Sequence, residues 1–324
     1  MHNLRNEFAA ALAGGELLLT EGAILERIRR ESGLPLHDDL AHTPLIYSED
    51  GRRALTTLWR EYIEIACAAN CPILICTPTW RANPERLARN HFPGVEKVSA
   101  DAVLLLQEIR SSFGDFAKRI FIGGLLGCRG DAYKPKEALN VDDAASFHSP
   151  QVQALANAGA DFLLAATLPA FSEAVGLAQA MADCSCPYLL SFVLRPSGTL
   201  LDGTPVADAI TQIDRRISPP PSAYLANCTH PLLFEQAMQE AENARPGTRE
   251  RLIGLQGNTS RRSPEEFDGS ATLDGEDPEA FAAFMARVRG RFGTRILGGC
   301  CGTDARHIEA IARQCGTETS HPSR

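Results

Sequence analysis

Short apolar runs alternate with longer amphipathic stretches along almost the whole chain. Eight of the runs have the length of a strand and are flanked by Gly, Pro, Ser or Asn, which is typical of buried strands. The predicted strands are Leu17–Leu19, Ile73–Cys76, Ile120–Leu125, Asp161–Ala165, Tyr188–Val193, Ala223–Ala226, Leu252–Leu255 and Thr294–Leu297. The predicted helices, which place apolar residues at helical spacing, are Ala54–Ala69, Ser99–Ser111, Ser149–Ala158, Phe171–Met181, Val206–Ile217, Leu232–Asn243, Pro278–Val288 and Thr303–Ala312.

This alternation predicts parallel strands joined by crossover helices. Eight such units in 324 residues fit an α/β protein with the (β/α)8 fold, a TIM barrel. We expect a single domain over residues 1–324 with its core at about 17–315. An open doubly wound sheet would also alternate, but the first predicted strand is followed by LTEGAIL and not by a GxGxxG phosphate loop. Polar stretches at Gly33–Gly51 and Arg261–Asp277 follow strands, where barrel enzymes carry their active-site loops.

Composition narrows the function classes. Hydrophobic residues make up 44% of the chain and charged residues 22%, so the chain is built to fold around a core. The net charge is −8 and no run is rich in Lys or Arg, which argues against a nucleic-acid partner. We find no apolar run of membrane-spanning length and no signal-peptide pattern, so we expect a cytoplasmic protein without a membrane partner. Ten cysteines in such a chain are expected to be buried side chains, metal ligands or catalytic groups.

The segment RILGGCCGTDARHIEAIA carries the clearest chemical signal. A predicted strand ends there in two glycines, the pair Cys300 and Cys301, a third glycine and a helix start. A Gly-rich turn lets both thiols face inward, and a helix N-terminus favours the thiolate form. A pair of buried cysteines or a vicinal disulfide is the alternative interpretation.

The segment AYLANCTHP supplies a third thiol at the end of the sixth predicted strand. Cys228 at this strand end can reach across the barrel mouth to the cysteine pair of the eighth strand. Three thiolates from two such junctions would form a zinc site with one open coordination position, as catalytic zinc requires. His230 is a rival ligand, but beside Pro231 we expect it in the first turn of a helix.

Three further strand ends offer groups for substrate binding. Glu21 follows the first strand and could hold an ammonium group, or it could simply stabilise a helix N-terminus. Thr77 and Trp80 follow the second strand, and Trp80 could stack on a cation or cover the barrel rim. Thr167 ends the fourth strand, and Asn227 lies beside Cys228.

The segments GGCCGTDARHIEAIA and ANCTHP, with 71 residues between Cys228 and Cys300, resemble the homocysteine S-methyltransferase family of zinc-dependent barrels. The likeness runs from about Leu17 to Ile311. It implies a zinc ion held by Cys228, Cys300 and Cys301 and a small thiol acceptor, commonly homocysteine, which coordinates the metal as a thiolate. The implied donor is a sulfonium such as S-methylmethionine or S-adenosylmethionine, or betaine. The implied product is methionine, so the implied role is methionine biosynthesis.

The sequence departs from the family pattern at three strand ends. Glu21-Gly22-Ala23 stands where the family has an acidic residue and paired glycines, and LQGNTSRR replaces a Pro-Asn-Ser-Gly segment. Ala166 stands where the family has a Glu that holds the amino group of the acceptor. We therefore keep three alternatives: a zinc-dependent methyltransferase acting on a different small thiol, a non-catalytic zinc- or thiol-binding barrel, and a metal-free redox pair at Cys300 and Cys301.

From the residues and the resemblance together we expect five side chains to contact substrate: Glu21, Asn227, Thr77, Thr167 and Trp80. No catalytic residue is expected apart from the metal site. The sequence leaves the donor and the oligomeric state open.

Overall fold

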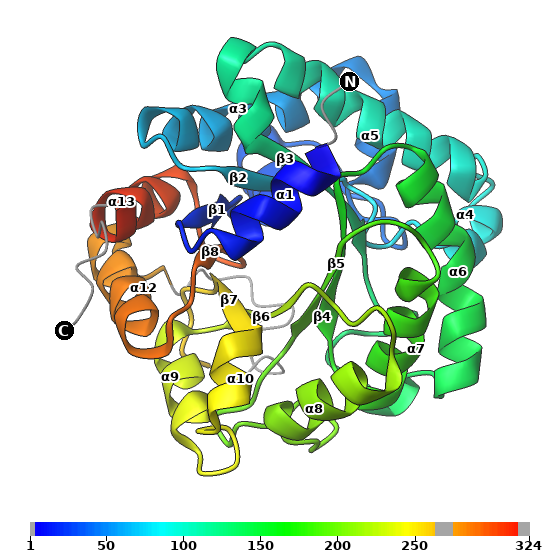
Figure 1. Ribbon diagram of the computed structural model, residues 1–324. Coiled ribbons are helices and arrows are strands. Elements are labelled where there is room, and N and C mark those ends of the chain that lie inside the picture. Colours follow the sequence, from blue (N-terminus) through cyan, green and yellow to red (C-terminus); the bar gives the residue numbers. More distant parts are fainter. Residues whose placement is uncertain (1–3, 263–274, 317–324) are drawn as a thin grey trace.

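Eight parallel strands form a closed barrel in which each strand pairs with its sequence neighbours and β1 also pairs with β8 (Figure 1). The computed structural model describes residues 4–262 and 275–316. The strands are β1 (Leu18–Thr20), β2 (Ile73–Cys76), β3 (Ile120–Leu126), β4 (Phe162–Leu168), β5 (Tyr188–Phe192), β6 (Ala223–Thr229), β7 (Leu252–Gly257) and β8 (Ile296–Gly299). The predicted (β/α)8 barrel with a single domain is therefore confirmed.

Helices surround the barrel, as parallel strands require, because each crossover must pack back onto the sheet (Figure 1). The longer helices are α1 (Leu4–Ala13), α3 (Glu49–Ala68), α5 (Val95–Ser111), α6 (Val141–Asn157), α7 (Phe171–Ala182), α8 (Val206–Arg216), α9 (Pro231–Gln239), α12 (Pro278–Phe292) and α13 (Ala305–Gly316). The shorter ones are α2 (Ile24–Arg27), η1 (Ile28–Ser32), η2 (Thr43–Tyr47), α4 (Pro84–Arg89), η3 (Gly114–Arg119), η4 (Pro135–Glu137) and α10 (Pro246–Arg251).

Three predicted helix starts are wrong. Helix α3 begins at Glu49, five residues before Ala54. Helix α5 begins at Val95, so Ser99 is buried inside the helix and does not cap it. Helix α6 begins at Val141, eight residues before Ser149, because Asn140 caps it by accepting a hydrogen bond from the Asp143 amide. Its internal Pro150 explains the late predicted start, since proline usually marks a first turn.

One of the two polar stretches predicted as active-site loops lines the cavity described below with residues 36–38, 41 and 42, although part of it is helical. The Gly33–Gly51 stretch contains η2 and the first residues of α3, and Ser48 caps α3 through its side chain. Most of the Arg261–Asp277 stretch lies outside the described residues.

Helix α1, which the sequence analysis did not predict, lies across the mouth formed by the amino-terminal ends of the strands (Figure 1). Phe8 is fully buried, stacks on Phe162 at a ring separation of 4.5 Å and meets Phe121 edge-on at 5.5 Å. Phe121 and Phe162 lie at the starts of β3 and β4. Since α1 covers this mouth, access to the barrel is left to the opposite mouth, where the carboxyl ends of the strands meet.

The apolar side chains form an inner cluster within the barrel and a larger cluster between strands and helices. Most side chains of both clusters are fully buried. Their close packing holds the strands in fixed positions. Within the described part of the chain, no helix is both long and apolar enough to cross a membrane.

Candidate metal centre

Three cysteine thiols meet at the carboxyl ends of β6 and β8. The Sγ atoms of Cys228 and Cys300 lie 2.7 Å apart, those of Cys300 and Cys301 lie 4.0 Å apart, and all three lie within 4.8 Å of one another. Cys228 is buried, and the other two are partly exposed. Elsewhere in residues 4–262 and 275–316, no three His, Cys, Asp or Glu side chains are grouped in this way. The structure thus brings together the three residues that the sequence singled out.

Cys228 is aimed into the mouth by an irregularity in β6. Its φ is +52°, in the left-handed region, and the register between β6 and β7 shifts between Asn227 and Thr229. Such a bulge turns a side chain away from the regular alternation of a strand. The side-chain amide of Asn258 donates to the Cys228 carbonyl at 3.0 Å and holds the bulge. A left-handed conformation strains the backbone of a cysteine, and such strain is common at functional sites.

Asn227 ties this bulge to two neighbouring strands. Its Oδ1 accepts from the Thr167 amide at 3.0 Å and from the Ser191 hydroxyl at 2.7 Å. Its Nδ2 donates to Thr167 Oγ1 at 2.8 Å and to Cys228 Sγ at 3.3 Å. Thr167 also has a positive φ, +61°, at a register shift in β4. One buried amide therefore fixes two strained strand ends, one of which carries a thiol of the cluster.

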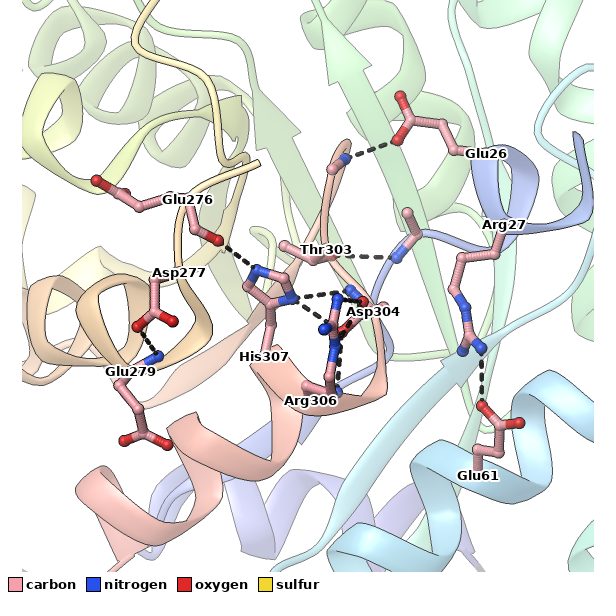
Figure 2. Close-up of polar contacts among 12 residues, drawn as sticks. Glu26, Arg27, Glu61, Glu276, Asp277, Glu279, Thr303, Asp304, Arg306 and His307 are labelled. Carbon is pink, nitrogen blue, oxygen red and sulfur yellow. Dashed lines mark hydrogen bonds and ion pairs between the residues drawn. The ribbon is translucent and has the colours of Figure 1, made fainter. Parts of the chain in front are cut away.

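Two backbone amides hold the turn that carries Cys300 and Cys301. The Cys300 amide donates to the Gly257 carbonyl at 2.7 Å, and the Gly302 amide donates to the Glu26 carboxylate at 2.6 Å (Figure 2). Gly302 has a φ of +83°, and a Cβ there would overlap Thr259 Oγ1. Only glycine fits this position, which explains the glycine after the cysteine pair.

The start of α13 joins the same turn to the loop after β1. The Thr303 hydroxyl donates to the Cys300 carbonyl at 2.7 Å. It also accepts from the Ala23 amide at 3.2 Å (Figure 2). Asp304 immediately precedes α13, and its carboxylate accepts from the Arg306 amide. These contacts make the cysteine turn a rigid element, as a preformed metal site requires.

Charge among the three thiols is unevenly distributed. Hydrogen bonds from Cys300, and then from Cys301, lower the pKa of the Cys228 thiol. The same hydrogen bonds raise the pKa values of Cys300 and Cys301, because a second thiolate would face the first one. The cluster thus favours one thiolate at Cys228, and a divalent cation would stabilise ionisation of the other two.

The cluster fits a zinc ion by chemistry and by size. Thiolates are ligands that zinc prefers, and a site with three protein ligands keeps one position open. Zn–S bonds of about 2.3 Å in a tetrahedron separate neighbouring sulfurs by about 3.8 Å. The separations of the three Sγ atoms, from 2.7 Å to no more than 4.8 Å, span this value. His230 is not a rival ligand here, because its Nδ1 accepts from the Leu232 amide and its Nε2 contacts Glu276.

The thiols open onto a cavity of about 550 Å³, the volume of a site for a small molecule. All five side chains predicted to contact substrate line its wall: Glu21, Thr77, Trp80, Thr167 and Asn227. Cys76 also lines the cavity, and Ala166, which replaces the family's Glu, lies on the same wall.

Glu21 lies deeper than the sequence analysis expected. Its carboxylate accepts from Trp59 Nε1 at 2.9 Å and from the Cys76 amide at 3.2 Å. Burial raises its pKa to about 8, although both hydrogen bonds act to lower it. Glu21 is therefore largely protonated at neutral pH, and its two interpretations, ammonium binding and helix stabilisation, both require the charged form.

Trp80 and Thr77 make contacts within the protein. The Trp80 indole donates to the Ala166 carbonyl at 3.3 Å, and its ring carries the guanidinium of Arg81 at 4.5 Å from the centroid. The Thr77 hydroxyl pairs with Thr79 and accepts from the Leu125 amide. The cation on Trp80 in this structure thus comes from the chain itself, and a substrate contact of either residue stays a prediction.

Sequence reasoning missed Tyr133, whose hydroxyl bonds to the Cys228 thiol and whose pKa is raised mainly by the charge at that thiol. Tyr133 lies in the loop between β3 and α6, at the cavity wall. The polar segment RGDAYKPK after the third strand is a signal that could have directed attention to this loop. Arg81 and His42 line the cavity too and were also missed.

A family model described as homocysteine S-methyltransferase matches residues 18–315. Homocysteine S-methyltransferase YbgG of Bacillus subtilis is 26% identical over 91% of this chain and 93% of its own length. Homocysteine S-methyltransferase of Escherichia coli is 26% identical over 94% of this chain and 97% of its own. The metallated crystal form of MmuM, an E. coli homocysteine methyltransferase, superposes with a TM-score of 0.73 at 22% identity, covering 92% of this chain and 96% of that one.

Proposed function

The chain belongs to the homocysteine S-methyltransferase family and is a methyltransferase, and from this membership we propose that it methylates the thiol of homocysteine to give methionine. The proposed donor is a small sulfonium such as S-methylmethionine or S-adenosylmethionine, or betaine. The proposed cofactor is Zn²⁺, held by Cys228, Cys300 and Cys301. The observation that carries the proposal is the convergence of these three thiols, within 4.8 Å, at a cavity that admits a small molecule.

A free thiol has a pKa of about 8.5 and is mostly protonated at neutral pH. Bound zinc would supply thiolate stabilisation, so that the acceptor is a nucleophile without a strong base. The thiol proton is released to solvent, and a sulfur lone pair then forms the new S–C bond. The bond between the methyl carbon and the donor heteroatom breaks with its electron pair, and the donor leaves neutral. The proposal requires no catalytic side chain beyond the metal ligands.

The chain's own residues bind and orient the two substrates. The cysteine turn and the bulge at Cys228 are rigidly held, so they would fix the direction from which the acceptor sulfur attacks. Apolar side chains of Leu125, Leu164 and Ala166 line the same cavity. A donor that loses its positive charge as the methyl group leaves reacts faster where fewer water molecules solvate that charge.

A specific observation supports a second candidate, methyl transfer to a different small thiol. Ala166 offers no carboxylate to an amino group, and the carboxylate of Glu21 is engaged with Trp59 and Cys76. Membership in an enzyme family leaves little ground for the non-catalytic barrel. A metal-free redox pair at Cys300 and Cys301 would account for neither Cys228 nor its strained backbone.

The test is to measure zinc content and methyl transfer together. We expect Cys301→Ser to lose most bound zinc and most methyl transfer to homocysteine while its unfolding transition stays cooperative, because a serine hydroxyl is a poor substitute for a thiolate. Cys315→Ser, which replaces a buried cysteine on α13 outside the cluster, is the matched control and should keep its zinc. Wild-type turnover in Cys301→Ser would refute the proposed function.

A further inference from the structure

One wall of the cavity carries a cation without a partner. Arg81 follows Trp80 in the loop after β2, lines the cavity and is half-buried. Within the described ranges its guanidinium makes no hydrogen bond and no ion pair; it only stacks on the Trp80 ring at 4.5 Å. A guanidinium that lies over an aromatic ring keeps N–H groups available for other partners, and a planar guanidinium can bind a carboxylate through two hydrogen bonds.

His42 also lines the cavity, and it carries a buried polar atom without a partner. It is 7% exposed, and its Nδ1 has no hydrogen-bond partner in the described structure. Burial lowers the pKa of His42 to about 4, so the ring is neutral near pH 7 and has one N–H to donate. A buried polar atom without a partner is costly, which is a reason to look for a ligand that supplies one.

Packing places His42 and Arg81 in neighbouring segments. The Thr43 hydroxyl donates to the Pro78 carbonyl at 2.5 Å, which ties the segment after η1 to the loop after β2. Leu40 and Ala82 belong to one buried apolar cluster. The segments that carry His42 and Arg81 are therefore packed against each other, and both residues line the same cavity.

No carboxylate among the described residues forms an ion pair with Arg81, although Asp131 lies close enough for the two charges to interact. The Asp131 carboxylate pairs with the Lys134 ammonium at 3.1 Å and accepts from the Tyr133 amide. Glu26 binds the Gly302 amide, and Glu21 is held by Trp59 and Cys76. Asp38 also lines the cavity, and it is exposed to solvent, which screens its charge.

We propose that Arg81, stacked on Trp80, and His42 form a subsite for the carboxylate of a substrate. The proposal rests on the proposed function, because it assumes that the cavity binds the methyl-transfer substrates. Recognition here would depend on a carboxylate, since Ala166 offers no anion to an amino group. Both the acceptor and an amino-acid donor carry a carboxylate, so the shared chemistry is one carboxylate held beside the metal site.

The experiment measures binding by calorimetry to the zinc-loaded protein with one substrate present at a time, so that no turnover occurs. The acceptor arm compares homocysteine with 3-aminopropane-1-thiol, which lacks only the carboxylate. The donor arm compares S-methylmethionine with (3-aminopropyl)dimethylsulfonium, which differs in the same way. In one arm, Arg81→Gln should weaken binding of the ligand that has a carboxylate by about 10- to 100-fold, which is what a charge-assisted hydrogen bond contributes. The affinity for the ligand of that arm that lacks the carboxylate should not change.

Controls separate a seated carboxylate from a general effect of charge. Arg53→Gln removes the same charge from the exposed face of α3 and should leave all four affinities unchanged. Arg81→Lys keeps the charge without the planar fork, so it should recover only part of the loss. Equal losses for both ligands of an arm, no loss in either arm, or no preference of the wild type for a carboxylate would each overturn the subsite.

Turnover of the same ligands tests the proposed function separately. A wild type that prefers the carboxylate ligands but never transfers a methyl group would refute that function and keep the subsite. If the wild type turns over normally and Arg81→Gln leaves all affinities unchanged, the proposed function stands and the subsite is refuted.

Discussion

Asn227 offers a sharp test of how the strand ends position the thiols. Substitution by Asp preserves its size and its Oδ1, which accepts from the Thr167 amide and from Ser191. It removes the two bonds that Nδ2 donates, to Thr167 Oγ1 at 2.8 Å and to Cys228 Sγ at 3.3 Å. The new carboxylate would also stand next to the thiol whose pKa the native hydrogen bonds lower.

The magnitude follows from the lost contact to a metal ligand. A hydrogen bond to a charged group contributes about 1.5–3 kcal/mol, and changes to groups that orient metal ligands cost about 10- to 100-fold in metal affinity. A 10- to 100-fold loss equals about 1.4–2.8 kcal/mol, so the two figures agree. We therefore expect Asn227→Asp to bind zinc about 10- to 100-fold more weakly than the wild type.

The assay is competition for zinc with a chromophoric chelator at neutral pH. The matched control is Ser191→Ala, which removes one hydrogen bond from Asn227 Oδ1 on the side away from Cys228. The control should lose about 1 kcal/mol of unfolding free energy and little zinc affinity. Equal zinc affinity in Asn227→Asp and the wild type would refute the view that this amide positions Cys228.

Two further predictions concern stability. Phe8→Ala should lower the free energy of unfolding in urea by about 3–5 kcal/mol without changing zinc affinity, because Phe8 fills the mouth opposite the thiols. The control is Leu104→Ala, at a position that is 53% exposed. A loss of zinc affinity in Phe8→Ala would contradict the assignment of the two mouths. Glu21 has a pKa of about 8 in the folded protein against an ordinary value of 4.5, so its contribution is fully present below about pH 4.5 and is lost as the pH rises through 8. The unfolding free energy of Glu21→Gln should therefore fall less than that of the wild type between pH 5 and pH 8, and parallel curves would show that Glu21 is ionised in the folded protein.

The sequence predicted the barrel because each strand is an apolar run of the right length between turn residues, and a local pattern is enough for that. It did not predict α1, because Phe8 becomes a core residue only when Phe121 and Phe162 come together from distant strands. The helix starts predicted at Ser99 and Ser149 are too late. Ser99 has the residue type of an N-cap but is buried inside its helix, and Pro150 has the residue type of a first turn but lies inside its helix.

The thiol cluster could be predicted because the carboxyl ends of parallel barrel strands share one mouth, so β6 and β8 bring Cys228 to Cys300. The left-handed backbone of Cys228 could not be predicted, because a positive φ is uncommon in residues other than glycine and a cysteine gives no sign of it. The engagement of Glu21 by Trp59 and Cys76 depends on residues 38 and 55 positions away. Tyr133 and Arg81 likewise reach the cavity from loops whose paths a local pattern does not give.

X-ray absorption at the zinc edge, on protein purified with reduced thiols and loaded with one equivalent of zinc, tests the metal centre most directly. We predict three sulfur neighbours at about 2.3 Å in the free protein and four once homocysteine is added. A spectrum with fewer than three sulfur neighbours, or a protein that retains no zinc while its thiols stay reduced, would contradict the account.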